Sequence, residues 1–248
     1  MQAVKVGSIK ESQGVRALSV KDQLPGCEVA INQRIYSLPE IAKGKRVVDI
    51  GCGYGANRAA VESVGGEWVG VEPFEGGEHT VVGDAENLPF ADNSFDVAIM
   101  DAVLEHIPDV GKAFAEVARI LKPKGVFVGY SAFMEPFHEI SYSHLSFRAI
   151  EHYAHINGLT LETVSGGGSF GIDHHFRILM LPTPLGKLSP AIAWMIRTLI
   201  RLKASAAMVA LKFARGLSFA EAKQLATNYY KLECLRQSVG FEFVIRKH

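Results

Sequence analysis

The sequence is poor in cysteine and has no excess of charge of either sign. Its three cysteines, Cys27, Cys52 and Cys234, lie far apart, and none belongs to a CxxC pair. This spacing argues against a disulfide framework or a zinc site and predicts a protein of a reducing compartment, the cytoplasm. The 26 Lys and Arg residues balance the 26 Asp and Glu residues. The overall charge therefore does not indicate nucleic acid or an acidic membrane as a partner.

Long apolar runs are also missing. The first residues lack the apolar core of a signal peptide, and no uncharged apolar stretch reaches the length of a membrane span. The sequence contains no internal repeat and no low-complexity tract. Its 248 residues, 48% of them hydrophobic, are enough to bury one substantial core. We therefore expect one domain with an elaboration rather than two domains.

The most informative stretch is residues 47–56, VVDIGCGYGA. Val47, Val48 and Ile50 predict a buried parallel strand, which runs into a Gly-x-Gly-x-Gly turn and then a helix-prone segment at 56–64. Glycines in such a turn let the backbone approach a ligand at the N-terminus of the helix. A tight turn without a ligand is the alternative, because one glycine-rich turn is weak evidence by itself.

Strand and helix patterns alternate along the following part of the chain. Further strands are predicted at 67–72, 80–84, 95–101, 125–130, 159–164 and 241–245. Helices are predicted at 110–121 and at about 147–157. This alternation predicts an α/β fold, a Rossmann-like, doubly wound and mostly parallel sheet with helices on both faces.

Two regions depart from this pattern. Residues 1–42 form a leader that ends in a helix predicted at 29–42, where Arg34 and Tyr36 either cover a ligand or lie on the surface. Residues 43–164 are predicted to form a cofactor-binding core, and residues 240–248 the last strand. Residues 165–239, between them, are interpreted as an insertion that serves as a lid or an oligomerisation element.

The predicted insertion is mainly helical. We expect a loop or hinge at 165–186, a helix at 189–214 that breaks near 203–205, and a helix at about 218–238. Ser218 and Glu221 have the spacing of a capping box at the start of that last helix.

Four of the predicted strands end in an acid: Asp49, Glu72, Asp84 and Asp101. Ligands of open α/β sheets bind beyond the carboxyl ends of the strands, so these acids should share one edge with the glycines. Glu72 lies about twenty residues past the turn, where an acid accepts both hydroxyl protons of a ribose. Asp84 is placed to accept from an adenine amine, and Asp49 to meet a cationic amino group. Each acid alone could instead cap a helix or form a salt bridge.

A dinucleotide such as NAD is the competing ligand. The glycines with Ala56 fit the Rossmann fingerprint, and Glu72 fits its ribose-binding acid. That fingerprint usually lies on the first strand at the start of a chain, whereas a helical leader precedes it here. The second acid, Asp84, is followed by a Leu-Pro-Phe loop and has no evident role beside a pyrophosphate. A nicotinamide-dependent oxidoreductase is therefore disfavoured.

Residues 47–130 resemble the class I S-adenosylmethionine-dependent methyltransferases, particularly the small-molecule branch. Six segments carry the resemblance in the order and spacing of the family: 48–53 (VDIGCG), 70–73 (GVEP), 83–90 (GDAENLPF), 94–97 (SFDV), 103–109 (VLEHIPD) and 121–125 (LKPKG). The stretch 47–130 that contains them is about a third of the chain. The resemblance implies a seven-stranded sheet whose last strand, 241–245, is antiparallel.

The same resemblance implies where S-adenosylmethionine and its product S-adenosylhomocysteine would bind. Gly51 and Gly53 would line the methionine part, and Glu72 the ribose. Asp84 and the backbone of Ala85 would contact the adenine, and Asp101 would form the floor of the pocket. Asp49, Cys52 and Pro73 complete the predicted set of cofactor-binding residues.

Methyl transfer requires little chemical catalysis by protein side chains, because the sulfonium already activates the methyl group. In-line positioning of the acceptor supplies most of the rate. A base is needed only if the acceptor must lose a proton. The candidates are His106, after the fourth strand, and His138 and His144, after the fifth. An ordinary core or surface histidine is the alternative for each. The other histidines lack a supporting carboxylate or cysteine pattern, so no metal site is predicted.

The sequence thus predicts methyl transfer to O, N or C of a small molecule, with hydrophobic, glycan-linked and lipid-linked acceptors all open. A non-catalytic, cofactor-binding partner subunit is the alternative. Neutral charge and the lack of an Asn-Pro-Pro-Tyr motif argue against a nucleic-acid acceptor. The basic amphipathic stretch 187–215 leaves two roles open. One is contact with an anionic membrane surface; the other, which we favour, is a lid or homodimer helix with a solvated basic face.

Overall fold

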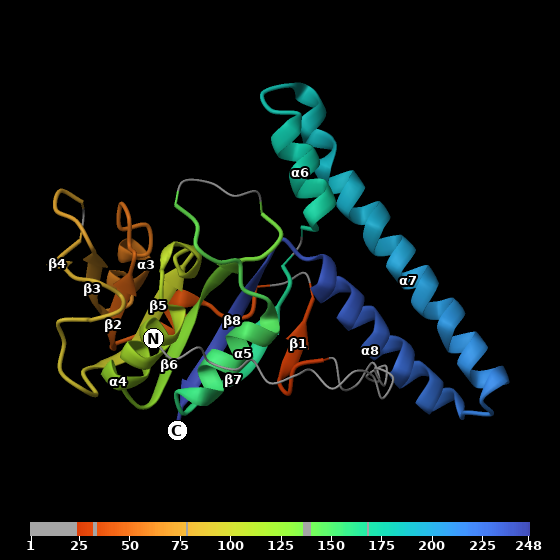
Figure 1. Cartoon of the computed structure of the whole chain (residues 1–248), viewed down its shortest axis with the longest axis horizontal. Helices are drawn as coiled ribbons and strands as arrows, with labels where there is room; N and C mark the ends of the chain where they lie inside the picture. The colour runs from red at the N-terminus through yellow and green to blue at the C-terminus, as the bar shows by residue number, and fades with distance from the viewer. Residues whose placement is uncertain (1–23, 32–33, 78, 136–139, 168) are drawn as a thin grey trace, which may run out of the picture.

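The computed structural model describes residues 24–31, 34–77, 79–135, 140–167 and 169–248. Its centre is one mixed sheet with the strand order β1-β7-β8-β6-β5-β2-β3-β4 (Figure 1). The strands are β1 (Glu28–Ala30), β2 (Arg46–Ile50), β3 (Glu67–Glu72), β4 (Val81–Val82), β5 (Phe95–Asp101), β6 (Leu121–Ala132), β7 (Leu159–Ser165) and β8 (Gly240–Lys247).

This topology confirms the predicted Rossmann-like fold. From β2 the chain moves outward through β3 to β4 and then returns to place β5 on the other side of β2. The strand order therefore reverses between β2 and β5, which is where ligands bind in such sheets. The last strand, β8, lies antiparallel between β6 and β7, as the sequence predicts. The three-residue strand β1 adds to the seven expected strands by pairing with β7.

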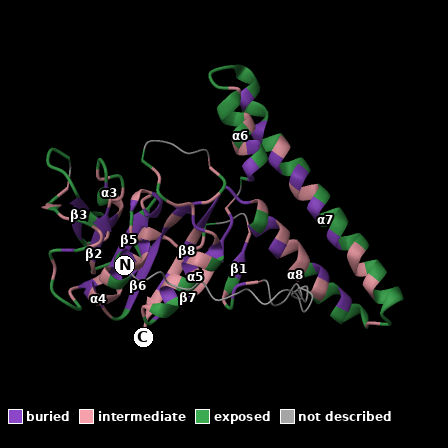
Figure 2. Ribbon diagram, viewed as in Figure 1, coloured by how far each residue is buried: buried purple, intermediate pink, exposed green. Residues whose placement is uncertain are grey.

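Helices cover both faces of the sheet. They are α2 (Leu38–Ala42), α3 (Arg58–Glu62), α4 (Val110–Ile120), α5 (Phe147–Ile156), α6 (Gly171–Leu179), α7 (Ser189–Ala214) and α8 (Phe219–Gln237), with 3₁₀ turns η1 (Leu104–His106) and η2 (Pro184–Leu188). On one face, Ile50, Met100 and Phe127 form a core with α4 and α5. On the other, Val47 and Ile99 pack with α2 and α3. Figure 2 shows the buried residues concentrated in the strands.

Side chains cap the N-termini of α4, α5 and α8. Asp109 accepts a hydrogen bond from the Lys112 amide at the start of α4, and Ser146 accepts one from the Ala149 amide at the start of α5. The predicted capping box of Ser218 and Glu221 is present at the start of α8. Each cap satisfies an amide that the first helical turn leaves without a partner.

The predicted helix at 29–42 is wrong in its first part. Val29 and Ala30 form β1 instead, and they pair with Val164 and Ser165 of β7. The helix α2 begins only at Leu38, with Pro39 in its first turn. Proline is tolerated there because amides of the first turn need no helical partner. The sequence favours a break at Pro39 near the end of the predicted helix, whereas the structure places Pro39 in the first turn of α2.

Two expectations for the insertion are also wrong. The segment predicted as a loop at 165–186 contains α6, where Asp173 is buried and accepts bonds from the Phe170 amide and the Ser189 hydroxyl. The helix α7 does not break near 203–205, because Ala204 is buried and no glycine or proline interrupts the helix. Among the described residues, no helix combines the length and apolar character needed to cross a bilayer. The limits of leader, core, insertion and last strand remain predictions.

The close approach of β5 and β6 gives a test of this packing. A Cβ added at Gly129 would lie 1.8 Å from the carbonyl oxygen of Met100. We predict that Gly129→Ala lowers the free energy of unfolding by about 3 kcal/mol or more, because two paired strands must separate. Gly44→Ala is the matched control, since a Cβ there meets nothing within 4 Å and adds only left-handed strain at a φ of 65°. Equal urea midpoints for the two variants would contradict this packing.

Candidate active site

The glycine turn follows directly after β2. Gly51 and Gly53 have φ values of 70° and 53°, a region that favours glycine. The amides of Gly51 and Cys52 donate to the carbonyl of Val71, at 2.8 and 3.3 Å, and so tie the turn to β3. A Cβ at Gly51 would lie 2.5 Å from the Val103 side chain, whereas a Cβ at Gly53 would meet nothing within 4 Å. Val103 therefore covers the backbone at Gly51, whereas the space beside the backbone of Gly53 is open.

Three of the predicted acids lie on one face of the sheet beside this turn. Successive side chains of a strand point to opposite faces, so Asp49 shares the face of Val47, and Asp101 that of Ile99. Glu72 shares the face of Trp68 in the same way. In register, Asp49 lies between Gly70 of β3 and Ile99 of β5. The structure thus brings Asp49, Glu72 and Asp101 together around the glycines.

Glu72 is 6% exposed. Its Oε1 accepts a hydrogen bond from the Gly53 amide at 2.5 Å. This hydrogen bond links the end of β3 to Gly53 of the turn. A carboxylate here presents hydrogen-bond acceptors, and no donor, to whatever lies over Gly53.

Asp49 is 1% exposed. It accepts hydrogen bonds from the indole Nε1 of Trp68 at 3.1 Å and from Nδ2 of Asn57 at 3.4 Å. Burial raises the pKa of Asp49 to about 6, against these two bonds, and the negative charges of Asp101 and Glu72 add to the rise. A positive charge beside Asp49 would stabilise the ionised form of this carboxyl group.

Asp84 and Ala85 lie further along the same edge. The Gly83 amide donates to the carbonyl of Glu72 at 2.8 Å, which holds the end of β4 beside the end of β3. Asp84 is exposed, and its carboxylate accepts from the Glu86 amide at 2.9 Å. Pro73 is exposed directly after β3. Gly53, Glu72 and Asp84 therefore follow one another along this edge of the sheet.

Cys52 contributes only its backbone to the turn. Its side chain is buried in the apolar cluster with Val47 and Trp68. Burial raises the pKa of its thiol to about 11, and the nearby carboxylates of Asp49 and Glu72 act in the same direction. The thiol is therefore neutral at ordinary pH.

The candidate bases differ in their surroundings. Val103 packs on Gly51, so η1 and its His106 begin next to the turn. Nδ1 of His106 lies 2.7 Å from the carbonyl of Ile140. A carbonyl only accepts, so Nδ1 carries a proton, and the lone pair of the neutral ring lies on Nε2. Nδ1 of His144 lies 3.2 Å from the carbonyl of Phe133, and His138 falls outside the described residues. No described trio of His, Cys, Asp or Glu could hold a metal ion.

Comparison with known proteins identifies this arrangement. Residues 48–129 match a family model described as a methyltransferase domain. Over these residues, about a third of its length, the chain is similar to a methyltransferase domain. The matched segment contains the turn, Glu72, Asp84 and Asp101.

Relatives of the methyltransferase domain agree with the match. An uncharacterized methyltransferase of Mycobacterium sp. (strain JLS) is 33% identical over 147 residues, which are 53% of this chain and 58% of that protein. Another, from Mycolicibacterium paratuberculosis, is 33% identical over 54% of this chain and 59% of its own length. The chain thus spans somewhat more than half the length of these relatives.

One solved structure supports the fold. A Galdieria sulphuraria protein, provisionally assigned as a sarcosine dimethylglycine methyltransferase, has a TM-score of 0.51 and 19% identity. The likeness covers 85% of this chain and 81% of that one.

Sequence reasoning did not single out Glu242 and Tyr130, which lie in register with Asp101. Asp101 of β5 lies opposite Tyr130 of β6, which lies opposite Glu242 of β8. Burial raises the pKa of Glu242, and the charge of Asp101 adds to the rise. The available signal was an acid between Phe241 and Phe243, because an antiparallel strand begins at the edge where its parallel neighbours end.

Arg34 and Tyr36 lie near this second group of acids. Arg34 is exposed and Tyr36 is half-buried. The Ile35 amide between them donates to Oε2 of Glu242 at 3.3 Å. Burial raises the pKa of the Tyr36 phenol, and the charges of Asp101 and Glu242 act in the same direction. The end of the leader therefore lies beside the acids, and its contact with a ligand remains a prediction.

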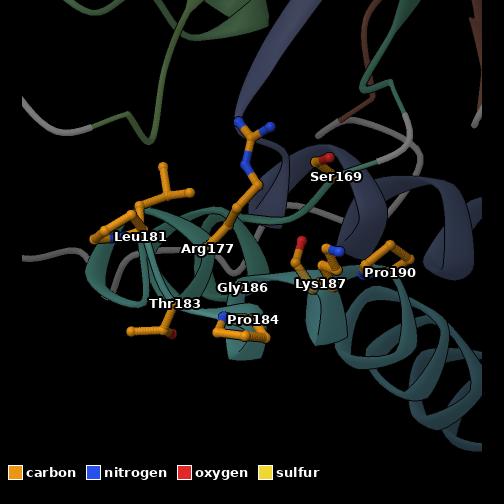
Figure 3. Close-up of a pocket in the computed structure, with 10 residues that line it drawn as sticks. Ser169, Arg177, Leu181, Thr183, Pro184, Gly186, Lys187 and Pro190 are labelled. Carbon is orange, nitrogen blue, oxygen red and sulfur yellow. The ribbon is translucent and has the colours of Figure 1, made fainter.

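Two of the cavities beside the insertion are lined in part by Arg177. One of about 260 Å³ lies between Tyr130 and Gly240 of the sheet and His174 and Arg177 of α6. The other, of about 700 Å³, lies within the insertion and shares Arg177 with the first (Figure 3). In Figure 3 the Arg177 side chain points away from Thr183 and Pro184. The larger cavity has no lining residue from the glycine turn or the acids.

The buried state of Asp49 predicts a pH effect on stability. Its folded pKa, about 6, lies above the ordinary value, so its stabilising contribution is complete below about pH 4 and is lost as the pH rises through 6. We predict that the free energy of unfolding of Asp49→Asn falls by about 3 kcal/mol less than that of the parent over this pH range. Urea unfolding of both ligand-free proteins between about pH 4 and about pH 7 measures it. Parallel pH profiles for the two proteins would contradict the assignment.

Proposed function

We propose that the protein transfers the methyl group of S-adenosylmethionine to an O, N or C atom of a small molecule. The observation that carries this proposal is the open backbone of Gly53 beside the buried carboxylates of Asp49 and Glu72, within a segment that matches a methyltransferase domain. S-adenosylmethionine supplies the activated methyl group when bound. The protein binds and orients the two reactants and excludes water from between them.

The chemistry of the edge suits this cofactor. The carboxylates of Asp49, Glu72 and Asp101 accept hydrogen bonds and attract positive charge. S-adenosylmethionine offers an amino group and a sulfonium, both positive, as well as ribose hydroxyls and an adenine amine. We assign Asp49 to the amino group, directly or through water, and Glu72 to the ribose. Asp84 and Ala85 take the adenine at the far end of the edge.

Two of these acids, Asp49 and Asp101, count against NAD. The pyrophosphate of a dinucleotide is an anion and would lie over the glycine turn. The buried carboxylate of Asp49 and the nearby carboxylate of Asp101 would repel it, because like charges are costly to bring together. This disfavours an oxidoreductase on physical grounds that are independent of the family match.

We assign the acceptor to the side of β6 and β8. Neighbouring strands are about 4.8 Å apart, so the row from Gly51 through Asp101 to Tyr130 spans about 10 Å. The row continues to Glu242 and reaches the cavity of about 260 Å³ beneath α6. That volume fits a small molecule or part of a larger one. Glu242, Tyr130 and Arg177 are the groups that would recognise it.

His106 is the proposed base for an acceptor that must lose a proton, because η1 begins beside Gly51 and its Nδ1 proton is bound by Ile140. His144 and His138 remain the other candidates. All three cysteines are free thiols, and we retain the cytoplasm as the proposed location.

Calorimetry with S-adenosylhomocysteine tests the cofactor assignment. We predict that Glu72→Gln and Asp84→Asn each weaken binding roughly tenfold to a hundredfold, because each loses charge-assisted hydrogen bonds. Glu62→Gln is the control, since that acid lies at the exposed end of α3 and pairs with Arg58. NADH should bind far more weakly than S-adenosylhomocysteine.

Three outcomes would count against the proposal. Unchanged affinity in Glu72→Gln or Asp84→Asn would overturn the assigned cofactor contacts. Tight NADH binding without S-adenosylhomocysteine binding would favour the oxidoreductase. Tight cofactor binding without methyl transfer to any acceptor would favour a partner subunit that only binds cofactor.

A further inference from the structure

The cavity of about 260 Å³ beneath α6 has two walls of opposite charge. Tyr130 and Glu135 line it from the side of the sheet, and His174 and Arg177 line it from α6. The remaining lining consists of backbone and small side chains: Gly166, Gly167, Ser169, Val239 and Gly240. The chemical character of the cavity therefore comes mainly from the four larger polar side chains.

The wall on the side of the sheet is acidic. Tyr130 lies over Gly240 of β8, where an added Cβ would overlap the phenol hydroxyl. That hydroxyl donates a hydrogen bond to Oε1 of the half-buried Glu135 at 2.6 Å. Burial raises the pKa of Tyr130, and the bond to Glu135 acts in the same direction. The negative charges of Glu105 and Asp101 add to the rise. The phenol is therefore neutral and stands among carboxylates.

The charge of this wall is only partly balanced. Glu242 lies in register with Tyr130. Burial raises the pKa of Asp101 and of Glu242, and the positive charge of Arg34 offsets part of each rise. Glu135 itself forms no ion pair with any described residue. A cation in the cavity would therefore find the carboxylate of Glu135 available to it.

The wall on the side of α6 is basic. Arg177 is exposed, and its guanidinium donates to Nδ1 of His174 at 3.4 Å. Because Nδ1 accepts this bond, the neutral ring of His174 carries its proton on Nε2. Burial lowers the pKa of His174, and the charge of Arg177 acts in the same direction, against the charge of Glu135. This wall thus presents N–H donors and one positive charge.

The acid of α6, Asp173, is engaged inside the insertion. It is 2% exposed and accepts hydrogen bonds from the Phe170 amide and the Ser189 hydroxyl. It lines neither of the two cavities that Arg177 lines. The guanidinium of Arg177 therefore faces the cavity with its charge unbalanced, and it has no ion-pair partner in the part of the chain that the structure describes.

Glu135 and Arg177 thus line one cavity without pairing with each other. A ligand with a single charge would leave one of them uncompensated, because a charged group that loses water needs a partner. The volume of about 260 Å³ corresponds to about nine water molecules, so the ligand is small. The cavity therefore fits a small molecule that carries both a cation and an anion.

We propose that the methyl acceptor is a small amino acid, bound with its amine at Glu135 and its carboxylate at Arg177. This inference rests on the proposed function and narrows the methylated atom to nitrogen. The acidic wall is the one nearer to the glycine turn, because Tyr130 lies beside Asp101 of β5. Figure 1 shows α6 on the far side of β8 from β2. The amine, and not the carboxylate, therefore points towards the methyl donor.

The acidic wall also suits the chemistry of a nitrogen acceptor. The ammonium first gives one proton to the proposed base, His106. The nitrogen lone pair then forms the new bond to the methyl carbon, and the electron pair of the broken C–S bond stays on sulfur. The products are S-adenosylhomocysteine and the N-methyl amino acid, which is positively charged at nitrogen. The carboxylate of Glu135 stabilises positive charge on this nitrogen before and after the transfer.

Isothermal titration calorimetry of the full chain, with and without S-adenosylhomocysteine, tests the assignment. The ligands are glycine, β-alanine, γ-aminobutyrate and δ-aminovalerate, with propylamine and butyrate as compounds that carry one charge each. We expect the tightest amino acid to bind roughly tenfold or more tightly than either single-charge compound, because it gains a charge-assisted bond at each wall. Mass spectrometry after turnover with S-adenosylmethionine should place the new methyl group on nitrogen.

Two variants separate the contributions of the walls. Arg177→Gln should weaken binding of the tightest amino acid roughly tenfold and leave binding of propylamine unchanged. Glu135→Gln should weaken binding of the same amino acid roughly tenfold and leave binding of butyrate unchanged. Arg215→Gln and Glu62→Gln are the matched controls, since both residues are exposed and neither lines the cavity. Both controls should bind the amino acid like the parent.

Three results would overturn the inference. The first is a set of amino acids that bind no more tightly than propylamine or butyrate. The second is unchanged affinity for the amino acid in Arg177→Gln or in a folded Glu135→Gln, and the third is a methyl group on the carboxylate oxygen. Arg177 is exposed, so its variant decides the matter even if Glu135→Gln loses its circular dichroism.

Failure of the proposed function has a different signature. A chain that does not bind S-adenosylhomocysteine would contradict the cofactor assignment. The titrations without S-adenosylhomocysteine measure the charge preference of the cavity in either case, so the two claims fail separately.

Discussion

The structure depends on a carboxylate, Asp49, that is withdrawn from water beside a turn without side chains. Burying an acid costs free energy unless partners compensate for it. Trp68 and Asn57 supply two hydrogen bonds, but the pKa remains raised to about 6. The fold therefore holds a negative group next to the open backbone of Gly53 at a cost. A positively charged ligand over that backbone would remove the cost, which is the physical basis of the proposed cofactor site.

The sheet explains why the other acids gather at the same place. Asp49, Glu72 and Asp101 stand on neighbouring strands at the point where strand order reverses, and each points to the same face. The antiparallel strand β8 brings Glu242 to the same edge from its beginning. The opposite face carries the apolar core with α4 and α5. One face of the sheet thus carries the larger apolar core, and the edge of the other face, beyond its own smaller core, provides the site.

Local patterns predicted the parts of the site that depend on short segments. The strands β3 and β5 have the predicted bounds, 67–72 and 95–101, because alternation and a terminal acid define each one. The parts that depend on distant contacts were not predictable. The edge strand β1 exists through its pairing with β7, more than a hundred residues away. The continuity of α7 depends on burial of Ala204, and the role of Glu242 on a register that local sequence does not encode.

The most direct test of the central claim is a crystal structure of the protein with S-adenosylhomocysteine. The account predicts the sulfur over the backbone of Gly51 and Gly53, the ribose hydroxyls on Glu72, and the adenine at Asp84 and Ala85. The amino group would lie next to Asp49, directly or through one water. A nucleoside bound elsewhere, with Glu72 still closed on the Gly53 amide and Asp49 facing no cation, would contradict the account.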